Sequence, residues 1–327
     1  METYNGDPCE MTDVTVPAQE TSLATCGNKK TMSLAYVLIT PARNEAAFIE
    51  KTIKSVVAQT VRPLKWVIVS DGSTDGTDEI VNKYAANHQW IELVRLPERR
   101  ERHFAGKVHA FNVGYTRIQN LPYDLIGNLD GDISFDERFF AVLLQCIKEN
   151  PRLGVVGGVL IENGAPKYDL RFTSATNVSG PCQLFRRDCF EDIGGYRPIK
   201  LGGVDLTAVL TARMKGWQTE TCRHVNYVHH RIMGTASRSL WEAALRGGHG
   251  DYRLGMHPGW EVFRCIYQMW SGRPIILSGG LRLVGFSWGV VTRATKVIPE
   301  DLVRFRRKEQ ARRLRDFPKK FAFIIAR

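Results

Sequence analysis

The chain has 327 residues, of which 43% are hydrophobic and 24% are charged, and its formal net charge is +11 at pH 7. These proportions are those of an ordinary globular protein, so they exclude a mainly disordered chain and a bundle of membrane-spanning helices. The length allows one large α/β domain with extensions, or two modest domains, and it suffices to bury a core without disulfide bonds.

The cysteines and the start of the chain indicate the cellular compartment. The seven cysteines include no C-x-x-C pair, and their odd number leaves one over in any disulfide scheme, which favours a reducing compartment. Residues 1–32 are polar and acidic and lack the basic start and apolar segment of a secretory signal. We therefore expect a disordered tail at residues 1–32 and a cytoplasmic protein.

The positive charge predicts an anionic partner. Much of the excess lies near the C-terminus, at Arg304, Arg306, Arg307, Lys308, Arg312, Arg313, Arg315, Lys319 and Lys320. A nucleic-acid reader usually carries its basic residues on a recognisable motif with stacking aromatics, and the sequence contains no such motif. We therefore expect no nucleic-acid partner and favour an anionic membrane surface.

Strand and helix patterns alternate from residue 33 onward. Short apolar runs predict strands at 34–40, 66–69, 91–96, 125–129, 153–161 and 182–185. Helical spacing of apolar residues predicts helices at 48–57, 108–118 and 205–215. This alternation is typical of an α/β fold with a mostly parallel sheet, in which the polar loops after Thr40, Val69 and Leu129 meet at one edge.

The third of these loops begins with a pair of carboxylates. Asp130 and Asp132 are separated by Gly131, which lets the backbone turn sharply at the end of a predicted buried strand. Mg²⁺ and Mn²⁺ prefer oxygen ligands and usually retain waters and substrate phosphates, so one or two protein carboxylates suffice. The pair predicts a site for one of these cations. An ordinary turn is the alternative, because Asp and Gly are turn residues whatever the function.

Four motifs in a fixed order carry a family resemblance. They are Pro41-x-Arg43-Asn44-Glu45, Asp71-Gly72-Ser73-x-Asp75, Gly106-Lys107-x-x-Ala110-x-Asn112-x-Gly114 and Leu129-Asp130-Gly131-Asp132. Their order and spacing resemble those of family 2 glycosyltransferases with the GT-A fold, over roughly residues 33–235. The resemblance implies a nucleotide-sugar half at 33–132 and an acceptor half at 133–235.

The resemblance also implies a site for a nucleotide-diphosphate sugar donor. The donor contacts would come from Pro41, Ala42, Arg43, Glu45, Asp71, Lys107 and Asp130. Asp71 would accept a hydrogen bond from a base N–H, which favours a pyrimidine or guanine edge over adenine, and Lys107 would meet phosphate as a point charge. The alternatives are a helix cap or Asx-turn for Asp71 and a solvated surface position for Lys107.

Asp205 is implied to be the general base of an inverting reaction. In inverting relatives a helix usually begins with a Glu-Asp pair. The matching segment here is Gly202-Gly203-Val204-Asp205, with Val204 in place of the first acid. A single carboxylate within hydrogen-bond reach can still remove the proton of the acceptor hydroxyl. A helix N-cap is the alternative role for Asp205.

The segment His229-His230-Arg231 supplies further candidates. It resembles the Arg-x-x-Gly-x-Ser segment of polyprenyl-phosphate sugar transferases, with one extra residue before Ser237, and implies Arg231 as a cation for the donor diphosphate. One histidine is implied as a third metal ligand beside the aspartates, and His230 is preferred because it adjoins Arg231. A hydrogen-bonded structural histidine is the alternative for each.

Residues 236–327 fall outside the resemblance and predict a basic helical extension. Residues 239–245 predict a helix, and the glycines of 247–255 predict a loop that could border the acceptor. Residues 274–292 are apolar but interrupted by Arg282, which predicts either a buried core helix or an interfacial segment. The polybasic stretch that follows favours attachment to a membrane surface.

These features predict an inverting hexosyltransferase that uses Mg²⁺ or Mn²⁺ and a UDP- or GDP-sugar. The resemblance to bacterial exopolysaccharide and cell-surface glycan glycosyltransferases implies a polyprenyl-linked or polysaccharide acceptor, and a peripheral location on the inner face of the cytoplasmic membrane. A non-catalytic nucleotide-sugar-binding subunit of a polysaccharide assembly complex is the alternative that Val204 suggests. A nucleotidyltransferase ranks last, because residues 41–45 contain no glycine for a phosphate loop.

Overall fold

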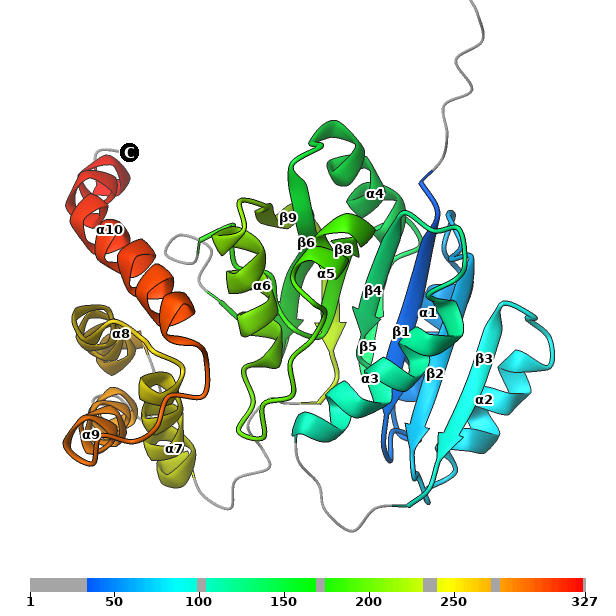
Figure 1. Ribbon diagram of the computed structural model, residues 1–327, viewed down its shortest axis with the longest axis horizontal. Coiled ribbons are helices and arrows are strands. Elements are labelled where there is room, and N and C mark those ends of the chain that lie inside the picture. The colour runs from blue at the N-terminus through cyan, green and yellow to red at the C-terminus, as the bar shows by residue number, and fades with distance from the viewer. Residues whose placement is uncertain (1–33, 99–103, 169–173, 232–239, 272–276, 326–327) are drawn as a thin grey trace, which may run out of the picture. The chain divides into compact units, whose positions relative to one another are not determined.

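The computed structural model describes residues 34–98, 104–168, 174–231, 240–271 and 277–325 (Figure 1). The chain divides into two units, residues 1–33 and residues 34–327. The first unit, which contains the predicted tail at 1–32, lies outside the described residues.

A mixed sheet forms the centre of the second unit. Its strands are β1 (Tyr36–Ala42), β2 (Lys65–Asp71), β3 (Ile91–Leu96), β4 (Leu125–Leu129), β5 (Ile133–Phe135), β6 (Leu153–Glu162), β7 (Ala165–Pro166), β8 (Cys182–Arg186) and β9 (Gln218–His229). They are ordered β3-β2-β1-β4-β8-β6-β9-β5, and β7 pairs with β6. Strands β1 to β4 run parallel, and β8 lies antiparallel between β4 and β6. The predicted α/β fold with a mostly parallel sheet is confirmed.

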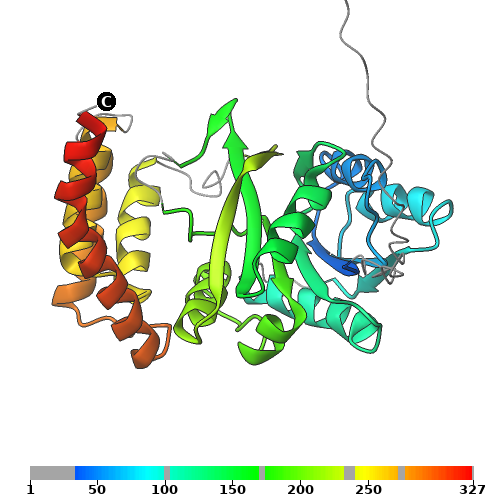
Figure 2. The same cartoon turned by 90° about the horizontal axis from the view of Figure 1, so that it is seen from above.

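Helices cover both faces of this sheet (Figure 2). They are α1 (Ile49–Val57), α2 (Thr77–Ala85), α3 (Phe104–Ile118), α4 (Phe139–Glu149), α5 (Arg187–Asp192) and α6 (Val204–Met214). Along β1, Tyr36 and Leu38 belong to one core and Val37 and Ile39 to the other. A strand that is buried on both faces must be apolar at every position, and this explains why β1 was recognisable as an uninterrupted apolar run.

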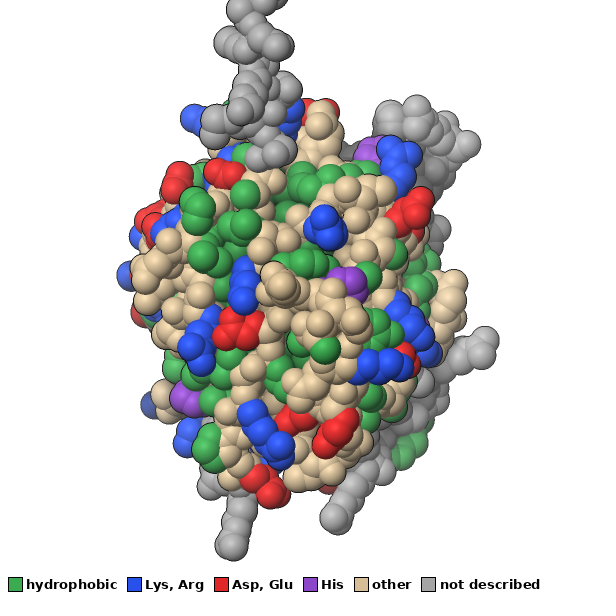
Figure 3. All heavy atoms as spheres, turned by 90° about the vertical axis from the view of Figure 1, so that its right-hand side faces the viewer, with side chains coloured by type: hydrophobic (Ala, Val, Ile, Leu, Met, Phe, Trp, Pro, Cys, Tyr) green, Lys and Arg blue, Asp and Glu red, His purple; other side chains and the backbone are tan. Residues whose placement is uncertain are grey.

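The edge strand β3 carries charges that protect it from pairing with other chains. Glu92 lies 2.9 Å from Lys65 and 3.6 Å from Arg117, and Arg95 lies 3.2 Å from Asp78. On this side of the molecule, basic and acidic side chains lie interspersed (Figure 3). The net positive charge of the chain is therefore not concentrated here.

The C-terminal part is helical, with α7 (Leu240–Arg253), α8 (Pro258–Ser271), α9 (Leu277–Val291) and α10 (Glu300–Ile325). Asp251 and Glu261 pair with Arg264 and Arg282, which joins α7, α8 and α9 through buried charges. Helix α10 is tied to α6 by Glu309, whose carboxylate lies 3.0 Å from the Arg213 guanidinium. Among the helices of the described ranges, none combines the length and apolarity that crossing a bilayer requires.

The predicted loop at 247–255 is wrong, because α7 continues through Arg253. Its glycines serve close packing: a methyl group on Gly248 would lie 1.8 Å from the carbonyl oxygen of Arg282, and one on Gly285 of α9 would lie 2.0 Å from that of Leu245. Glycine therefore marks the α7–α9 contact rather than a break in the helix, so this segment does not form the loop that could border the acceptor.

We predict that Gly248→Ala destabilises the protein by about 1–3 kcal/mol, because the added methyl group forces α7 and α9 apart. The matched control is Gly250→Ala in the same helix, where nothing lies within 4 Å of the added methyl group. That control should be neutral or should stabilise by up to about 1 kcal/mol, since alanine is the better helix former. Urea denaturation followed by circular dichroism measures both, and equal effects of the two substitutions would contradict the packing argument.

Candidate active site

The first two polar loops at the carboxyl edge of the sheet are held together by hydrogen bonds. Asn44, whose φ is 55°, donates its backbone N–H to Ser73 Oγ over 3.1 Å, and its side-chain oxygen accepts from the N–H of Thr74 over 2.9 Å. The N–H of Glu45 donates to Thr77 Oγ1 over 2.9 Å. The motif after β2 thus shapes the motif after β1, and an Arg43 guanidinium nitrogen lies 4.0 Å from Asp71 Oδ2.

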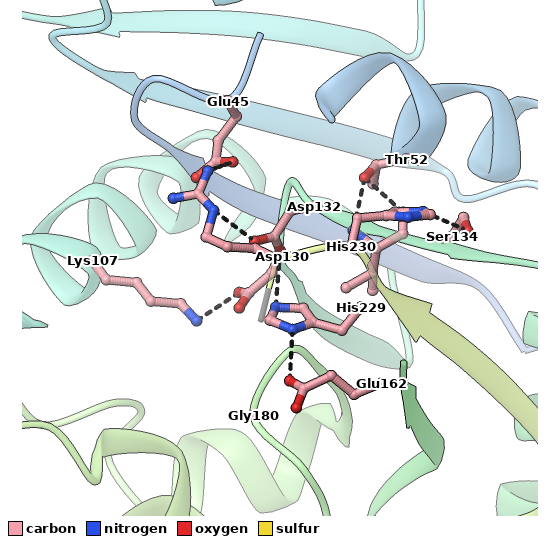
Figure 4. Close-up of polar contacts among 12 residues, drawn as sticks. Glu45, Thr52, Lys107, Asp130, Asp132, Ser134, Glu162, Gly180, His229 and His230 are labelled. Carbon is pink, nitrogen blue, oxygen red and sulfur yellow. Dashed lines mark hydrogen bonds and ion pairs between the residues drawn. The ribbon is translucent and has the colours of Figure 1, made fainter. Parts of the chain in front are cut away.

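The carboxylates after β4 face basic side chains from two other parts of the chain, α3 and the end of β9 (Figure 4). Lys107 of α3 donates to Asp130 Oδ1 over 2.6 Å. Asp132 lies 3.3 Å from His229 Nε2 and 3.4 Å from Arg231 Nε, and Arg231 also donates to Glu45. Residues that lie almost two hundred positions apart in the sequence therefore form one charged cluster.

This cluster shifts the ionisation of its members. Burial opposes the charge of Lys107, but Asp130, Asp205 and Asp132 outweigh it and raise the pKa of the amine. Burial raises the pKa of Asp130 to about 6 in spite of the attraction of Lys107. Burial also opposes ionisation of Asp132, but the hydrogen bond and charge of His229, with Arg231 and Lys107, outweigh it and lower the pKa of this carboxyl.

The structure distinguishes the two histidines. Side chains alternate along a strand, so His229 and His230 leave the end of β9 on opposite sides. The antiparallel register pairs His229 with Ile133, next to Asp132. His230 Nε2 instead lies 2.9 Å from Ser134 Oγ, and its ring stacks on Phe48 at 6.1 Å between centroids. The preference for His230 as the third ligand is thus not supported by the geometry, which favours His229.

Asp205 is the second residue of α6, and its side chain does not cap the helix. The N-cap is Gly203, whose φ of 85° suits glycine. Asp205 lines a small cavity together with Lys107, Asn128 and Tyr196. Its carboxylate also approaches Gly180 so closely that a methyl group there would lie 2.1 Å from Oδ2. The N-cap alternative is not what the structure shows, and the carboxylate faces the Lys107 side of the cluster.

The structure brings most of the predicted site residues together at one edge of the sheet. Pro41 and Ala42 end β1, followed by Arg43 and Glu45, and Asp71 ends β2. His230 is the exception, while Ser237 lies outside the described residues. Sequence reasoning missed Glu162, a buried carboxylate 3.5 Å from His229 Nδ1, because no motif surrounds it and only the pairing of β6 with β9 brings it here.

The donor set is chemically suited to a hard divalent cation, although it forms no closed cage. Within the described ranges, no group of three or more His, Cys, Asp or Glu side chains is arranged to hold a metal ion. Mg²⁺ and Mn²⁺ bound with a nucleotide usually take one or two carboxylates and complete their shell with waters and phosphate oxygens. Asp130 and Asp132 supply such oxygens, and His229 Nε2 lies beside them, so the residues present fit an open site.

A mixed sheet with a carboxylate pair after its fourth strand, and basic side chains around that pair, agrees with the predicted GT-A arrangement of a nucleotide-diphospho-sugar transferase. Residues 37–174 match the family model described as glycosyl transferase family 2. Curated relatives include the poly-beta-1,6-N-acetyl-D-glucosamine synthases of Staphylococcus aureus (strain COL), 30% identical over 170 residues, and of Staphylococcus epidermidis, 28% identical over 170 residues. Each match covers 46% of this chain and 39% of the relative, so the chain spans about two-fifths of these relatives' length.

Solved structures of low identity share the fold. The mannosyltransferase PcManGT from Pyrobaculum calidifontis, in complex with GDP-Man and Mn²⁺, is 19% identical with a TM-score of 0.54, and the match covers 89% of this chain and 88% of that one. TarS 1–349 of S. aureus, in complex with UDP-GlcNAc, is 14% identical with a TM-score of 0.51, over 78% of this chain and 72% of that one. Residues 37–174 are therefore similar to family 2 glycosyltransferases, the fold is GT-A, and the predicted resemblance is confirmed.

Proposed function

We propose that this protein is an inverting glycosyltransferase that moves a hexosyl group from a UDP- or GDP-sugar to a glycan acceptor. The observation that carries the proposal is the cluster of Asp130, Asp132, Lys107 and Arg231 at the carboxyl edge of the sheet. It offers carboxylates for a cation and, beside them, fixed positive charges for a diphosphate. The family 2 domain and the synthase relatives support the same reaction class.

The donor would lie across the loops after β1 and β2. Pro41, Ala42, Arg43 and Glu45 would face base and ribose, and Asp71 would accept a hydrogen bond from a base N–H. The neighbour structures hold GDP-Man and UDP-GlcNAc, and both bases offer such an N–H. Lys107 and Arg231 would contact the diphosphate, where negative charge grows as the bond to the sugar breaks.

Asp130, Asp132 and His229 would hold Mg²⁺ or Mn²⁺ beside the diphosphate. The cation would neutralise the leaving group and act as a Lewis acid on its oxygens. Lys107 and Arg231 already neutralise the carboxylates in the free protein, so these side chains would turn from Asp130 and Asp132 toward phosphate as the donor enters.

Asp205 would act as the general base. From the first turn of α6 its carboxylate would accept the proton of the acceptor hydroxyl, whose oxygen attacks the anomeric carbon from the side opposite the leaving diphosphate. Only one carboxylate is needed for this step, which accommodates Val204 in place of the first acid. Lys107 lines the same cavity as this carboxylate.

The acceptor would be a polyprenyl-linked oligosaccharide or a polysaccharide, in the synthesis of a cell-surface glycan. The relatives named as synthases of a poly-N-acetylglucosamine support this class of product. A lipid-linked acceptor would place the protein at the inner face of the cytoplasmic membrane. Because Val204 replaces the first acid, a second candidate function is a subunit that binds the sugar nucleotide without turnover.

We predict that one of UDP and GDP binds in the presence of Mn²⁺, and that Asp132→Asn weakens this binding at least tenfold because the negative charge of a ligand is lost. Isothermal titration of both nucleotides, with and without Mn²⁺, measures the effect. The matched control is Asp136→Asn, an exposed aspartate four residues further on, which should bind as wild type does. Absence of binding under every condition would contradict both the donor site and the metal site.

A second prediction separates catalysis from binding. Asp205→Asn should retain the donor affinity and the thermal stability of the wild type, but lose about 10²–10⁴-fold in turnover, since the amide cannot take the proton. Turnover is measured as nucleoside diphosphate released from the bound sugar nucleotide when a bacterial lipid extract supplies acceptors. Equal release by the wild type and the variant would exclude Asp205 as the base, and tight donor binding without release by either would favour the non-catalytic subunit.

A further inference from the structure

Helix α9 is apolar on all sides although only part of it is covered. Its inner face packs on α7 and α8 through Gly279, Gly285, Phe286 and Gly289, which are buried. Its outer face carries Val284, Trp288 and Val291, whose exposed fractions are 57%, 64% and 76%. Helices that are hydrophobic all round are normally enclosed by protein or lipid.

The one charged residue of α9 does not interrupt this outer face. Arg282 turns inward, where its guanidinium pairs with Asp251 of α7 and lies 3.4 Å from Glu261 of α8. The neighbouring helix extends the exposed apolar surface with Val262 and Ile266, which are also exposed. Met269 of α8 lies against Gly279 and Gly280 of α9, so the two helices adjoin at this surface.

The next helix supplies positive charge. The basic residues of α10 point in different directions. Arg306 turns inward and donates to the carbonyl oxygen of Leu254. A basic stripe of exposed side chains at helical spacing is formed by Arg304, Lys308, Arg312 and Arg315. Helix α10 packs on α8 through Phe317 and Phe263, with ring centroids 4.6 Å apart. The apolar face and the basic stripe thus belong to helices that pack on one another, and together they offer what the acyl chains and anionic headgroups of a bilayer bind.

We propose that the outer face of α8 and α9, with Val262, Ile266, Val284, Trp288 and Val291, docks on the surface of an anionic lipid bilayer. The helices lie in the interface without spanning it, with the apolar side chains among the acyl chains and the stripe of α10 near the headgroups. The inference rests on the proposed function in that a lipid-linked acceptor lies in such a surface, but its test requires no activity.

The test is co-sedimentation of the full chain with vesicles of phosphatidylcholine and phosphatidylglycerol in a 3:1 ratio. Wild type should bind these vesicles, and bind pure phosphatidylcholine more weakly. Val284→Ser with Trp288→Ser should reduce binding at least tenfold and leave nucleotide binding unchanged. The matched control is Leu64→Ser with Leu201→Ser, which removes two exposed apolar side chains outside the C-terminal helices and should bind vesicles like wild type.

Several outcomes would overturn the docking surface. Wild type that binds neither vesicle, or a Val284→Ser, Trp288→Ser variant that binds like wild type, excludes this face as a lipid contact. A wild-type dimer that becomes a monomer in the variant, as seen by light scattering without lipid, assigns the face to a second copy of the chain instead. Vesicle binding by a protein that binds no nucleotide would leave the surface in place and defeat the proposed function alone.

A different observation concerns Glu162, at the end of β6. The parallel register pairs Ile161 with Val228, so Glu162 and His229, the next residue of each strand, lie side by side. The carboxylate of Glu162 is buried, pairs with Lys167, and lies 3.5 Å from His229 Nδ1. Since the other ring nitrogen lies 3.3 Å from Asp132, the imidazole is held between two carboxylates (Figure 4).

We infer that Glu162 is a positioning residue that directs His229 Nε2 at the metal proposed beside Asp132. A histidine binds a metal through one nitrogen and normally donates the other N–H to a carboxylate or carbonyl, which fixes the ring and its tautomer. Glu162 is placed to accept from Nδ1–H, and its carboxylate is held by an ion pair with Lys167. This inference rests on the proposed metal site and adds a residue that no motif of the sequence identifies.

The experiment measures Mn²⁺ affinity by electron paramagnetic resonance in the presence of the nucleotide that binds. Glu162→Gln should weaken Mn²⁺ binding by about 10–100-fold, and His229→Ala at least as much. In a His229→Ala background, Glu162→Gln should cause no further loss of Mn²⁺ affinity. If the substitution acted by loosening the whole fold, it would lower the affinity in this background as much as in the wild type. Glu149→Gln, a surface glutamate on α4, is the control and should bind Mn²⁺ like wild type.

The results distinguish a failure of the role of Glu162 from a failure of the proposed metal site. If wild type binds Mn²⁺ and Glu162→Gln binds it equally well, or if the effect of the substitution persists without His229, Glu162 does not position the ligand. If wild type binds no Mn²⁺, the proposed metal chemistry fails and the role of Glu162 fails with it.

Discussion

The carboxylates after β4, of which Asp132 is buried and Asp130 is half-buried, can be withdrawn from water only because basic side chains from distant parts of the chain meet them there. An ionised carboxylate removed from water without a partner costs several kcal/mol, so the site depends on Lys107 for Asp130 and on Arg231 and His229 for Asp132. These cations come from α3 and from the end of β9. The charge balance therefore links α3 and the end of β4 to the end of β9, and it keeps in place the side chains of the proposed donor and metal site.

Strand register decides which side chains take part in that balance. β9 lies between β6 and β5, and the two registers place His229 next to both Glu162 and Asp132. A shift of one residue along β9 would bring His230 into this position, because alternate side chains of a strand point to opposite faces. The site is thus as sensitive to the pairing of β6 with β9 as to the identity of its ligands.

The sequence predicted the fold where local patterns determine it. β1 and β4 were recognisable because burial on both faces makes a strand uniformly apolar, whereas β5 and β7, of three and two residues, are too short for any pattern. The motifs located Asp130, Asp132, Lys107 and Asp205 in the chain, and the structure gathers them. Glu162 and the choice of His229 could not be predicted, because both depend on long-range pairing. The loop predicted around Gly248 was wrong for a related reason. The sequence alone does not distinguish a glycine that ends a helix from one that allows a second helix to pack closely.

Buried carboxylates are also paired with basic side chains in the C-terminal helices. There the pairing leaves an apolar outer surface instead of a charged site. Asp251 and Glu261 draw Arg264 and Arg282 into the interior, which removes the only charge of α9 from its outer face. A Lys or Arg at position 282 without these partners would extend toward water and give α9 a polar side. The buried acids of α7 and α8 thus produce the exposed apolar face of α9, and a variant such as Asp251→Asn would alter the proposed docking surface through a residue that is not part of it.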